Sequence, residues 1–286
     1  MSIEVRNLSH TYAPDTPFQA VAVHDISFTL GDGELVGLIG HTGSGKTTLV
    51  QHLNGLMKPT AGSVLVDGVD LAQKGADLAA IRKEVGLVFQ YPEYQLFEES
   101  VLKDIAFGPL NMGLGREEAE ARSREAALLV GLPESVLEQS PFDLSGGQKR
   151  RVAIAGVLAM KPSTLILDEP AAGLDPAGRR EMLDLLRSLH ASRGLTLVMV
   201  SHSMTDVARL CRRVLVMNQG RLAMDGTPGE VFSRPEELKS MGLGLPRAAA
   251  LALALREAGF PIPEGLWRME DVEQAILDAL KGGNGA

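Results

Sequence analysis

A glycine-rich segment with one lysine carries the clearest chemistry in the sequence. Residues 40–47 fit the pattern G-x-x-x-x-G-K-[ST], directly after the apolar run 35–39 and before a helical pattern at 48–56. In this context the glycines let backbone N–H groups turn toward phosphate oxygens, Lys46 supplies a cation to the β- and γ-phosphates, and the Thr47 hydroxyl can bind Mg²⁺. We therefore predict a nucleotide-phosphate site built from Gly40, His41, Thr42, Gly43, Ser44, Gly45, Lys46, Thr47 and Thr48.

Two adjacent acids follow the apolar run 164–167. Asp168 and Glu169 stand where a buried strand of a parallel sheet opens into its ligand crevice. We expect Asp168 to hold Mg²⁺, directly or through water, and Glu169 to act as the general base on the attacking water. Solvated acids at a strand end are the alternative, but an ATP–Mg²⁺ complex at Lys46 requires a carboxylate here.

A second anion-binding feature is the segment LSGGQ at 144–148, which opens a helical pattern at 148–160. Free N–H groups and the positive end of the helix dipole would face outward there to receive an anion. Because the chain already has one phosphate cradle, a second one implies a phosphate held from elsewhere. A helix cap alone would explain the serine but not the whole set, which is Ser145, Gly146, Gly147 and Gln148.

At this point the chain resembles the ATP-binding cassette (ABC) family, whose signature is LSGGQ. The resemblance implies that Gln90 touches Mg²⁺ and the attacking water and that His202 contacts the γ-phosphate. It also implies that Tyr12 stacks on adenine and that the loop with Asp175 crosses a dimer interface. Asp175 before Pro176 equally fits a helix N-cap, and both roles can hold.

The family mechanism implied by this resemblance needs two chains. Two cassettes pair head to tail, with each ATP between Lys46 of one chain and Ser145 of the other. Binding closes the dimer and hydrolysis reopens it.

Within the family, the chain is most similar to the ATP-binding A subunits of energy-coupling factor (ECF) transporters, which take up vitamins and metal ions. The stretches that carry this similarity are YPEYQLF (91–97), VLKDIAFGP (101–109), PFDLSGGQKRRV (141–152) and AGVLAM (155–160). Residues 172–175 and 201–204 look more like the second, A-prime type. An ordinary ABC importer cassette remains an alternative.

The ECF resemblance implies several partners. They are a second ABC ATPase subunit (a different chain, although pairing with itself is compatible), a transmembrane coupling (T) protein and a substrate-binding membrane (S) protein. The expected place is the cytoplasmic face of the cell membrane, and the substrate is not encoded here. Glu93, Glu98 and Glu99 could pair with a basic coupling helix of the T protein, or they could be solvated surface acids.

The expected fold follows from strand and helix patterns that alternate along the chain. Strands are predicted at 3–8, 21–30, 35–39, 64–66, 85–89, 165–167, 195–200 and 214–217, and helices at 116–130, 148–160, 246–258 and 269–281. Thr227 to Glu230 has the residues of a capping box. We predict an α/β fold: a P-loop NTPase (RecA-like) core with the family's antiparallel β subdomain, an inserted helical subdomain and a small helical C-terminal extension. The ATPase domain would span 1–234, with the helical subdomain at about 91–162. The extension 235–286 is also similar to that of the ECF A subunits, and this resemblance implies that it helps dimerisation.

Composition sets further limits. The 286 residues are 45% hydrophobic and 22% charged with a net charge of −8, which indicates a folded protein and does not favour nucleic acid as a partner. The single cysteine, Cys211, excludes an internal disulfide framework and is more typical of a core position than of a nucleophile. We expect neither a membrane span nor a secretory signal. A DNA-maintenance ABC ATPase is disfavoured because the 98 residues between Lys46 and Ser145 show no sustained heptads.

Overall fold

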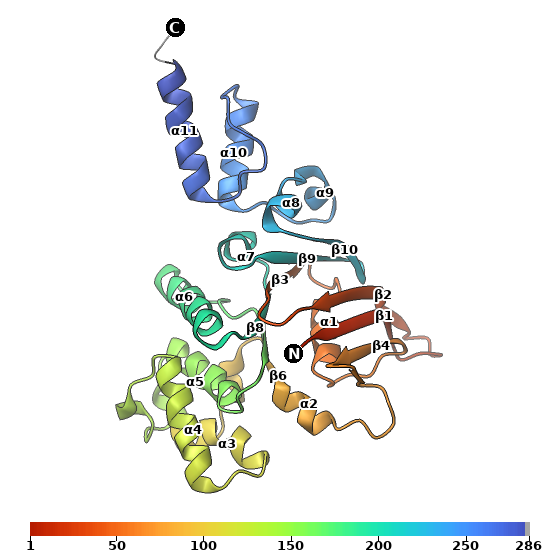
Figure 1. Ribbon diagram of the computed structural model, residues 1–286, viewed down its shortest axis with the longest axis vertical. Helices are drawn as coiled ribbons and strands as arrows, with labels where there is room; N and C mark the ends of the chain where they lie inside the picture. The colour runs from red at the N-terminus through yellow and green to blue at the C-terminus, as the bar shows by residue number, and fades with distance from the viewer. Residues whose placement is uncertain (284–286) are drawn as a thin grey trace.

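The computed structural model describes residues 1–283 and the side chains up to residue 280, so residues 284–286 of the predicted extension lie outside the described residues. The predicted α/β fold is confirmed, and it contains two sheets (Figure 1). The smaller sheet is antiparallel, in the order β2-β1-β4-β5. Its strands are β1 (Ile3–Tyr12), β2 (Ala20–Leu30), β4 (Ala61–Val66) and β5 (Val69–Asp70).

The larger sheet has the order β10-β9-β3-β8-β7-β6 and is parallel except for its edge strand β10. Its strands are β3 (Leu35–Gly40), β6 (Val85–Val88), β7 (Thr164–Asp168), β8 (Thr196–Val200), β9 (Arg213–Asn218) and β10 (Arg221–Gly226). Every residue of β3, β7 and β8 is buried, because helices or the smaller sheet cover both faces. The carboxyl ends of these three strands therefore meet at one edge.

Alternate residues of the central strands pack into two separate cores. Leu165 and Leu197 belong to the core that contains helix α6 (Pro176–Arg193), whereas Ile166 and Val198 pack with helix α1 (Lys46–Leu53) and the smaller sheet. This alternation is the period of two that a pleated strand imposes.

Between β6 and β7 the chain forms helices, as predicted (Figure 1). The region starts with a single-turn 3₁₀ helix, η1 (Pro92–Gln95). Three longer helices follow and pack on one another: α3 (Val101–Asn111), α4 (Arg116–Leu129) and α5 (Gly146–Leu158). Two further 3₁₀ turns, η2 (Glu134–Val136) and η3 (Pro141–Asp143), lie between α4 and α5.

The structure contains some helices and strands that the sequence patterns did not predict, for physical reasons. Strand β5 has two residues, and β10 is an edge strand with mostly exposed positions. Helices α2 (Leu78–Glu84) and α7 (Met204–Leu210) have two turns each, and α3 contains Gly108 and Pro109, which weaken the helical pattern. The predicted helices at 48–56 and 148–160 each begin two residues earlier, at Lys46 and Gly146.

The chain after β10 forms four helices: α8 (Pro228–Phe232), α9 (Pro235–Ser240), α10 (Arg247–Glu257) and α11 (Met269–Gly283). The predicted capping box at Thr227 and Glu230 is present. Helices α10 and α11 share a small core of their own, formed around Ala248, Ala252, Ile262 and Val272, and lie at one end of the molecule (Figure 1). None of the helices in the described part of the chain has the length and apolar character needed to cross a membrane.

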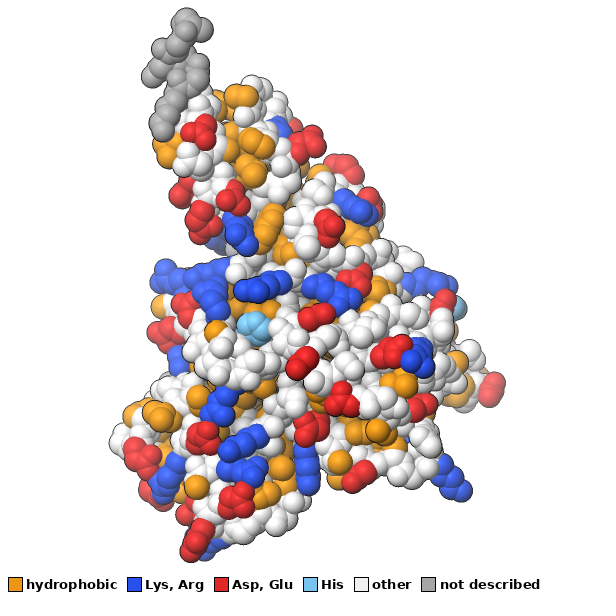
Figure 2. Space-filling view, in the orientation of Figure 1, with side chains coloured by type: hydrophobic (Ala, Val, Ile, Leu, Met, Phe, Trp, Pro, Cys, Tyr) orange, Lys and Arg blue, Asp and Glu red, His pale blue; other side chains and the backbone are white. Residues whose placement is uncertain are grey.

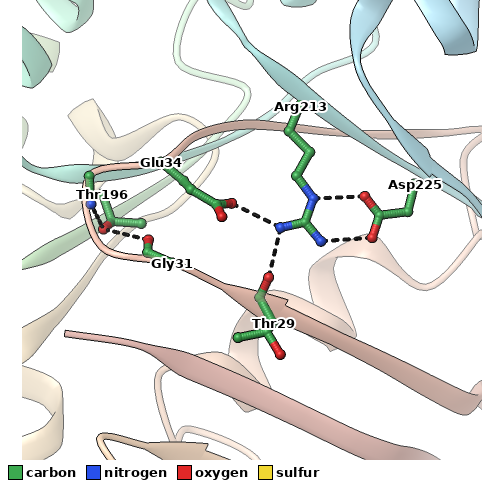
Figure 3. Close-up of polar contacts among 7 residues, drawn as sticks. Thr29, Gly31, Glu34, Thr196, Arg213 and Asp225 are labelled. Carbon is green, nitrogen blue, oxygen red and sulfur yellow. Dashed lines mark hydrogen bonds and ion pairs between the residues drawn. The ribbon is translucent and has the colours of Figure 1, made fainter.

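Arg213 joins the two sheets (Figure 3). From β9 its guanidinium donates two hydrogen bonds of 2.7 Å to Asp225 on β10 and one of 2.9 Å to Glu34, which precedes β3. It also donates to the carbonyl of Thr29 on β2, in the other sheet, at 2.7 Å. The two carboxylates raise the pKa of Arg213 above its usual range, so the link stays charged.

Candidate functional site

The glycine-rich loop joins β3 to α1 and folds tightly on its neighbours. A Cβ at Gly40 would lie 2.4 Å from the carbonyl of Met217, and Gly45 has φ of 100° with only 2.5 Å to the carbonyl of Ala22. Only glycine fits either position. His41, Thr42 and Gly43 form the half-buried to exposed tip of the loop, which places their backbone within reach of a ligand.

Lys46 lies inside this loop. Its ammonium donates to the carbonyls of Gly40 at 2.8 Å and His41 at 2.9 Å, and lies 3.5 Å from the hydroxyl of Ser44. Burial lowers the pKa of Lys46, while the nearby carboxylates of Glu169 and Asp168 oppose that change. The loop therefore holds one cation at the point where the strand ends converge.

Thr47 and Asp168 form an oxygen pair beside the lysine. The Thr47 hydroxyl donates to Asp168 Oδ2 at 3.4 Å. Burial raises the pKa of Asp168, and Thr47 and Lys46 oppose the rise. Hydroxyl and carboxylate oxygens are the donors that Mg²⁺ takes beside substrate phosphates, so these residues fit that ion.

Glu169 has the features of a general base. Its backbone has φ of 53°, a left-handed conformation that costs a non-glycine residue about 1–3 kcal/mol and often marks a functional site. Its Oε1 atom is buried and accepts no hydrogen bond from any described residue, and His202 Nε2 lies 3.5 Å away. Burial, together with the charge of Asp168, raises the pKa of Glu169 to about 7. A carboxylate poised near neutral pH with an unpartnered oxygen can accept a proton from water.

His202 follows β8 and completes this group. Burial and the charge of Lys46 lower its pKa, while Asp168 opposes the change. The structure therefore brings together four of the residues predicted from separate motifs, at the ends of three adjacent strands: Lys46, Asp168, Glu169 and His202.

The LSGGQ segment is an open surface at the start of α5. Ser145 caps the helix by accepting from the Gln148 N–H at 3.3 Å, and the Gln148 side chain accepts from the Ser145 N–H at 3.0 Å. Neither Gly146 nor Gly147 has a positive φ, and a Cβ on either would meet no atom within 4 Å. No contact among the described residues requires these glycines, so their lack of side chains leaves room for another molecule.

The remaining predicted residues surround the loop and the helical region. The Tyr12 hydroxyl lies 3.1 Å from that of Thr48 on α1, and its half-exposed ring makes an edge contact with His10. Gln90 is exposed and lies two residues after the end of β6. Asp175 caps α6 by accepting from Gly178 N–H at 2.9 Å, which confirms the predicted cap. The roles of these residues toward nucleotide stay predictions.

Arg150 is the residue that sequence reasoning missed. It is 2% exposed, and its guanidinium holds Glu93 through two hydrogen bonds of 3.2 and 2.9 Å. It also donates to the carbonyls of Pro170 at 3.1 Å and Ala172 at 2.6 Å. The guanidinium of Arg150 thus links three parts of the chain to one another: the segment after Gln90, helix α5 with the LSGGQ signature, and the residues after Glu169.

The expectation for Glu93 was wrong on both alternatives. Its carboxylate is only 17% exposed and is already paired, so it is neither a solvated acid nor free for a partner's coupling helix. A signal was present in the sequence: Arg150 shares helical spacing with the buried Ile154 and Leu158, which marks an arginine on an apolar face.

Comparison with known proteins gives one consistent result. A family model described as "ABC transporter" matches residues 23–172. The chain is 53% identical over 285 residues to the energy-coupling factor transporter ATP-binding protein EcfA2 of Clostridium perfringens, covering 99% of this chain and 100% of that protein. It is 56% identical over 286 residues to the protein of the same name from Symbiobacterium thermophilum, covering 100% and 99%.

Solved structures agree. The structure of cbiO1 from Clostridium perfringens, part of the ABC transporter complex cbiONQ, matches with a TM-score of 0.74 and 38% identity, covering 87% of this chain and 97% of that one. A dimeric ATP-binding cassette in a post-hydrolysis state, bound to ADP and Pi, matches with a TM-score of 0.70 and 29% identity over 79% and 98% of the two chains.

Glu169→Gln should change stability in a pH-dependent way. The folded-state pKa of about 7 lies above the ordinary value of 4.5, so ionised Glu169 destabilises the fold, and the cost appears as pH rises from about 4.5 through 7. Without nucleotide and with a chelator present, we expect the variant to be more stable than the wild type at pH 8, by at most about 3 kcal/mol, and equal at pH 4.5. Urea unfolding at both pH values measures this. Exposed Glu117→Gln is the control, and a pH-independent gain in Glu169→Gln would contradict the account.

Glu93→Gln should loosen two segments at once. Removal of the carboxylate charge leaves the buried guanidinium of Arg150 without its ion-pair partner. We expect amide hydrogen exchange to accelerate at least about tenfold in both 91–97 and 170–175, with little change in 40–47. Glu99→Gln, which removes an exposed acid paired with Lys103, serves as the matched control. Acceleration in only one of the two segments would show that Arg150 does not couple them.

Proposed function

Because the chain belongs to the ABC transporter family and, within it, to the ATP-binding proteins of energy-coupling factor transporters, we propose that it hydrolyses ATP to power uptake of vitamins or transition-metal ions through a transmembrane coupling protein. The observation that carries this is the convergence of Lys46, Asp168, Glu169 and His202 at the ends of β3, β7 and β8. These residues supply a phosphate cation, a metal ligand, a base and a polar γ-phosphate contact in one crevice.

The chemistry assigned to each residue follows from its contacts. The loop N–H groups and Lys46 bind the β- and γ-phosphates, and the Tyr12 ring, beside Thr48, is placed to stack on the base. Thr47 and Asp168 would hold Mg²⁺, which neutralises charge on the phosphates when bound. Glu169 accepts the proton of the attacking water. Its pKa of about 7 leaves it able to do so near neutral pH.

A second ATPase subunit completes the site in this proposal. Exposed Gly146, half-buried Gly147 and the N–H groups of α5 support it, since they form an anion site in addition to this chain's own phosphate cradle. The partner is a different ABC ATPase or a second copy. We assign residues 1–234 to the ATPase domain, about 91–162 to its helical subdomain and 235–286 to a dimerisation element. Exposed apolar side chains on the extension support that last role: Leu251, Phe260, Leu277 and Leu280.

The membrane partner would dock on the helical subdomain. A groove of about 500 Å³ runs along α3 and α4, between Phe107 and Leu110 on one side and Arg116 and Glu120 on the other. Phe107 packs edge to face against Phe97, and both rings are about half exposed. Apolar side chains line this groove together with charged ones, Glu98 and Lys103 among them. Such a lining suits an amphipathic helix of the coupling protein, so the chain would lie at the membrane surface.

Kinetics separate the roles of two residues. Glu169→Gln should lower ATP turnover by about 10²- to 10⁴-fold and leave ATP affinity nearly unchanged, because the base acts only on water. Lys46→Ala should abolish tight ATP binding, because the phosphates lose their buried cation. Calorimetry and a phosphate-release assay measure both. Normal affinity in Lys46→Ala would refute the phosphate cradle, and normal turnover in Glu169→Gln would refute the base.

Affinity purification from detergent-solubilised native membranes tests the assembly. We expect recovery of a second ATPase chain, a transmembrane coupling protein and small substrate-binding membrane proteins. Phe107→Asp should lose the membrane proteins and keep the second ATPase, whereas Leu128→Asp, at a more exposed apolar residue outside the groove, should lose neither. Recovery of two permease chains and a soluble binding protein would instead make the chain an ordinary importer cassette.

A further inference from the structure

A wide cleft separates the C-terminal extension from the rest of the protein. Its volume is about 940 Å³, comparable with small-molecule sites. One wall comes from the end of α6, from α7 and from residues 210–212, and the other from the start of α10 and from residues 267–270. At one point the walls touch, where the backbone N–H of Arg247 donates to the hydroxyl of Thr205 at 3.2 Å.

The cleft is strongly cationic in a protein whose net charge is −8. A single carboxylate, that of Glu270, lines it, whereas five arginines do: Arg187, Arg209, Arg212, Arg247 and Arg268. Figure 2 shows a band of Lys and Arg side chains across the molecule below the C-terminal helices. Like charges that line one cleft repel one another, so the arrangement favours binding of an anion.

The arginines differ in how far they are neutralised. Arg187 and Arg209 share Asp184, at 3.0 and 3.6 Å from its Oδ1. Arg212, Arg247 and Arg268 form no ion pair with any residue between 1 and 280. Three guanidinium groups from the two walls are therefore available to one ligand.

The chemistry of these groups indicates the ligand class. A guanidinium presents a planar fork of N–H donors that matches the oxygens of phosphate. Arg268 is further ordered by stacking on Trp267, with 4.5 Å between its central carbon and the ring centroid. Three such forks in a space of this size suit a compound with several phosphate groups rather than a single small anion.

We propose that this cleft binds a small polyphosphorylated molecule, comparable in size to a nucleotide, which bridges the C-terminal extension and α7. A free compound fits better than a lipid headgroup, because α10 and α11 lie at the opposite end of the molecule from α3 and α4, where the membrane partner would dock (Figure 1). Helix α7 begins two residues after His202, so the bound molecule would join the extension to the segment that carries a residue of the ATP site. The binding itself does not depend on the proposed transport role.

Trp267 makes this directly measurable, because it is the only tryptophan in the chain and lines the cleft. Inorganic tripolyphosphate would be titrated into the full chain carrying Lys46→Ala, which removes the ATP phosphate site, and in parallel into the wild type. We expect a saturable fluorescence change in both proteins. Arg212→Ala and Arg247→Ala should each weaken binding at least about fivefold, since each removes a charge-assisted contact. Exposed Arg221→Ala, outside the cleft, should leave it unchanged.

Three outcomes would overturn the proposal. One is the absence of a saturable response to tripolyphosphate. Another is a response that sodium sulfate reproduces at equal ionic strength and that Arg212→Ala and Arg247→Ala leave intact. The third is Arg212- and Arg247-dependent sedimentation with phosphatidylglycerol vesicles, but not phosphatidylcholine vesicles, without a tripolyphosphate response; this would assign the cleft to a lipid headgroup.

Discussion

The ammonium of Lys46 is buried beside two buried carboxylates, and the core of the fold serves to hold these three charges together. Burial lowers the pKa of the lysine and raises that of Asp168 and Glu169, while the attraction between the opposite charges offsets part of each change. Such a group is tolerated only where its positions are fixed. Fully buried parallel strands and two glycines that admit no side chain provide that rigidity.

The excess of negative charge has a chemical consequence. With one cation for two carboxylates, Glu169 stays near its titration point and keeps one oxygen without a partner. The second anion site of the proposed mechanism, the LSGGQ segment, lies elsewhere on the surface, at the glycines that begin helix α5. Arg150 connects the two sites, because it binds the carbonyls that follow Glu169 while its own backbone belongs to that helix. A movement of helix α5 relative to the core would therefore be transmitted to Glu169 through the side chain of Arg150.

The sequence predicted the parts of the site that depend on local patterns. A glycine-rich loop between strand and helix, acids at a strand end and a capped glycine-rich helix start each depend on neighbouring residues, and the structure confirms these local contexts. What the sequence did not reveal depends on tertiary contacts. Arg150 meets Glu93 across 57 positions, and the five arginines of the cleft come from separate helices and turns, so neither group is visible as a motif. Some missed elements, such as β5 and α7, are short, and β10 lies at an edge, where periodicity is weakest, whereas α6 was missed although it has 18 residues.

In the proposed assembly with a different ATPase chain, each ATP is shared between the phosphate cradle of one chain and the LSGGQ signature of the other. The most direct measurement counts tightly held nonhydrolysable ATP analogue in the purified assembly with Lys46→Ala, with Ser145→Arg and with both substitutions in this chain. The account predicts that each single variant loses a different one of two bound molecules and that the double variant retains none. A double variant that retains as much analogue as either single variant would place Lys46 and Ser145 at the same nucleotide and contradict the account.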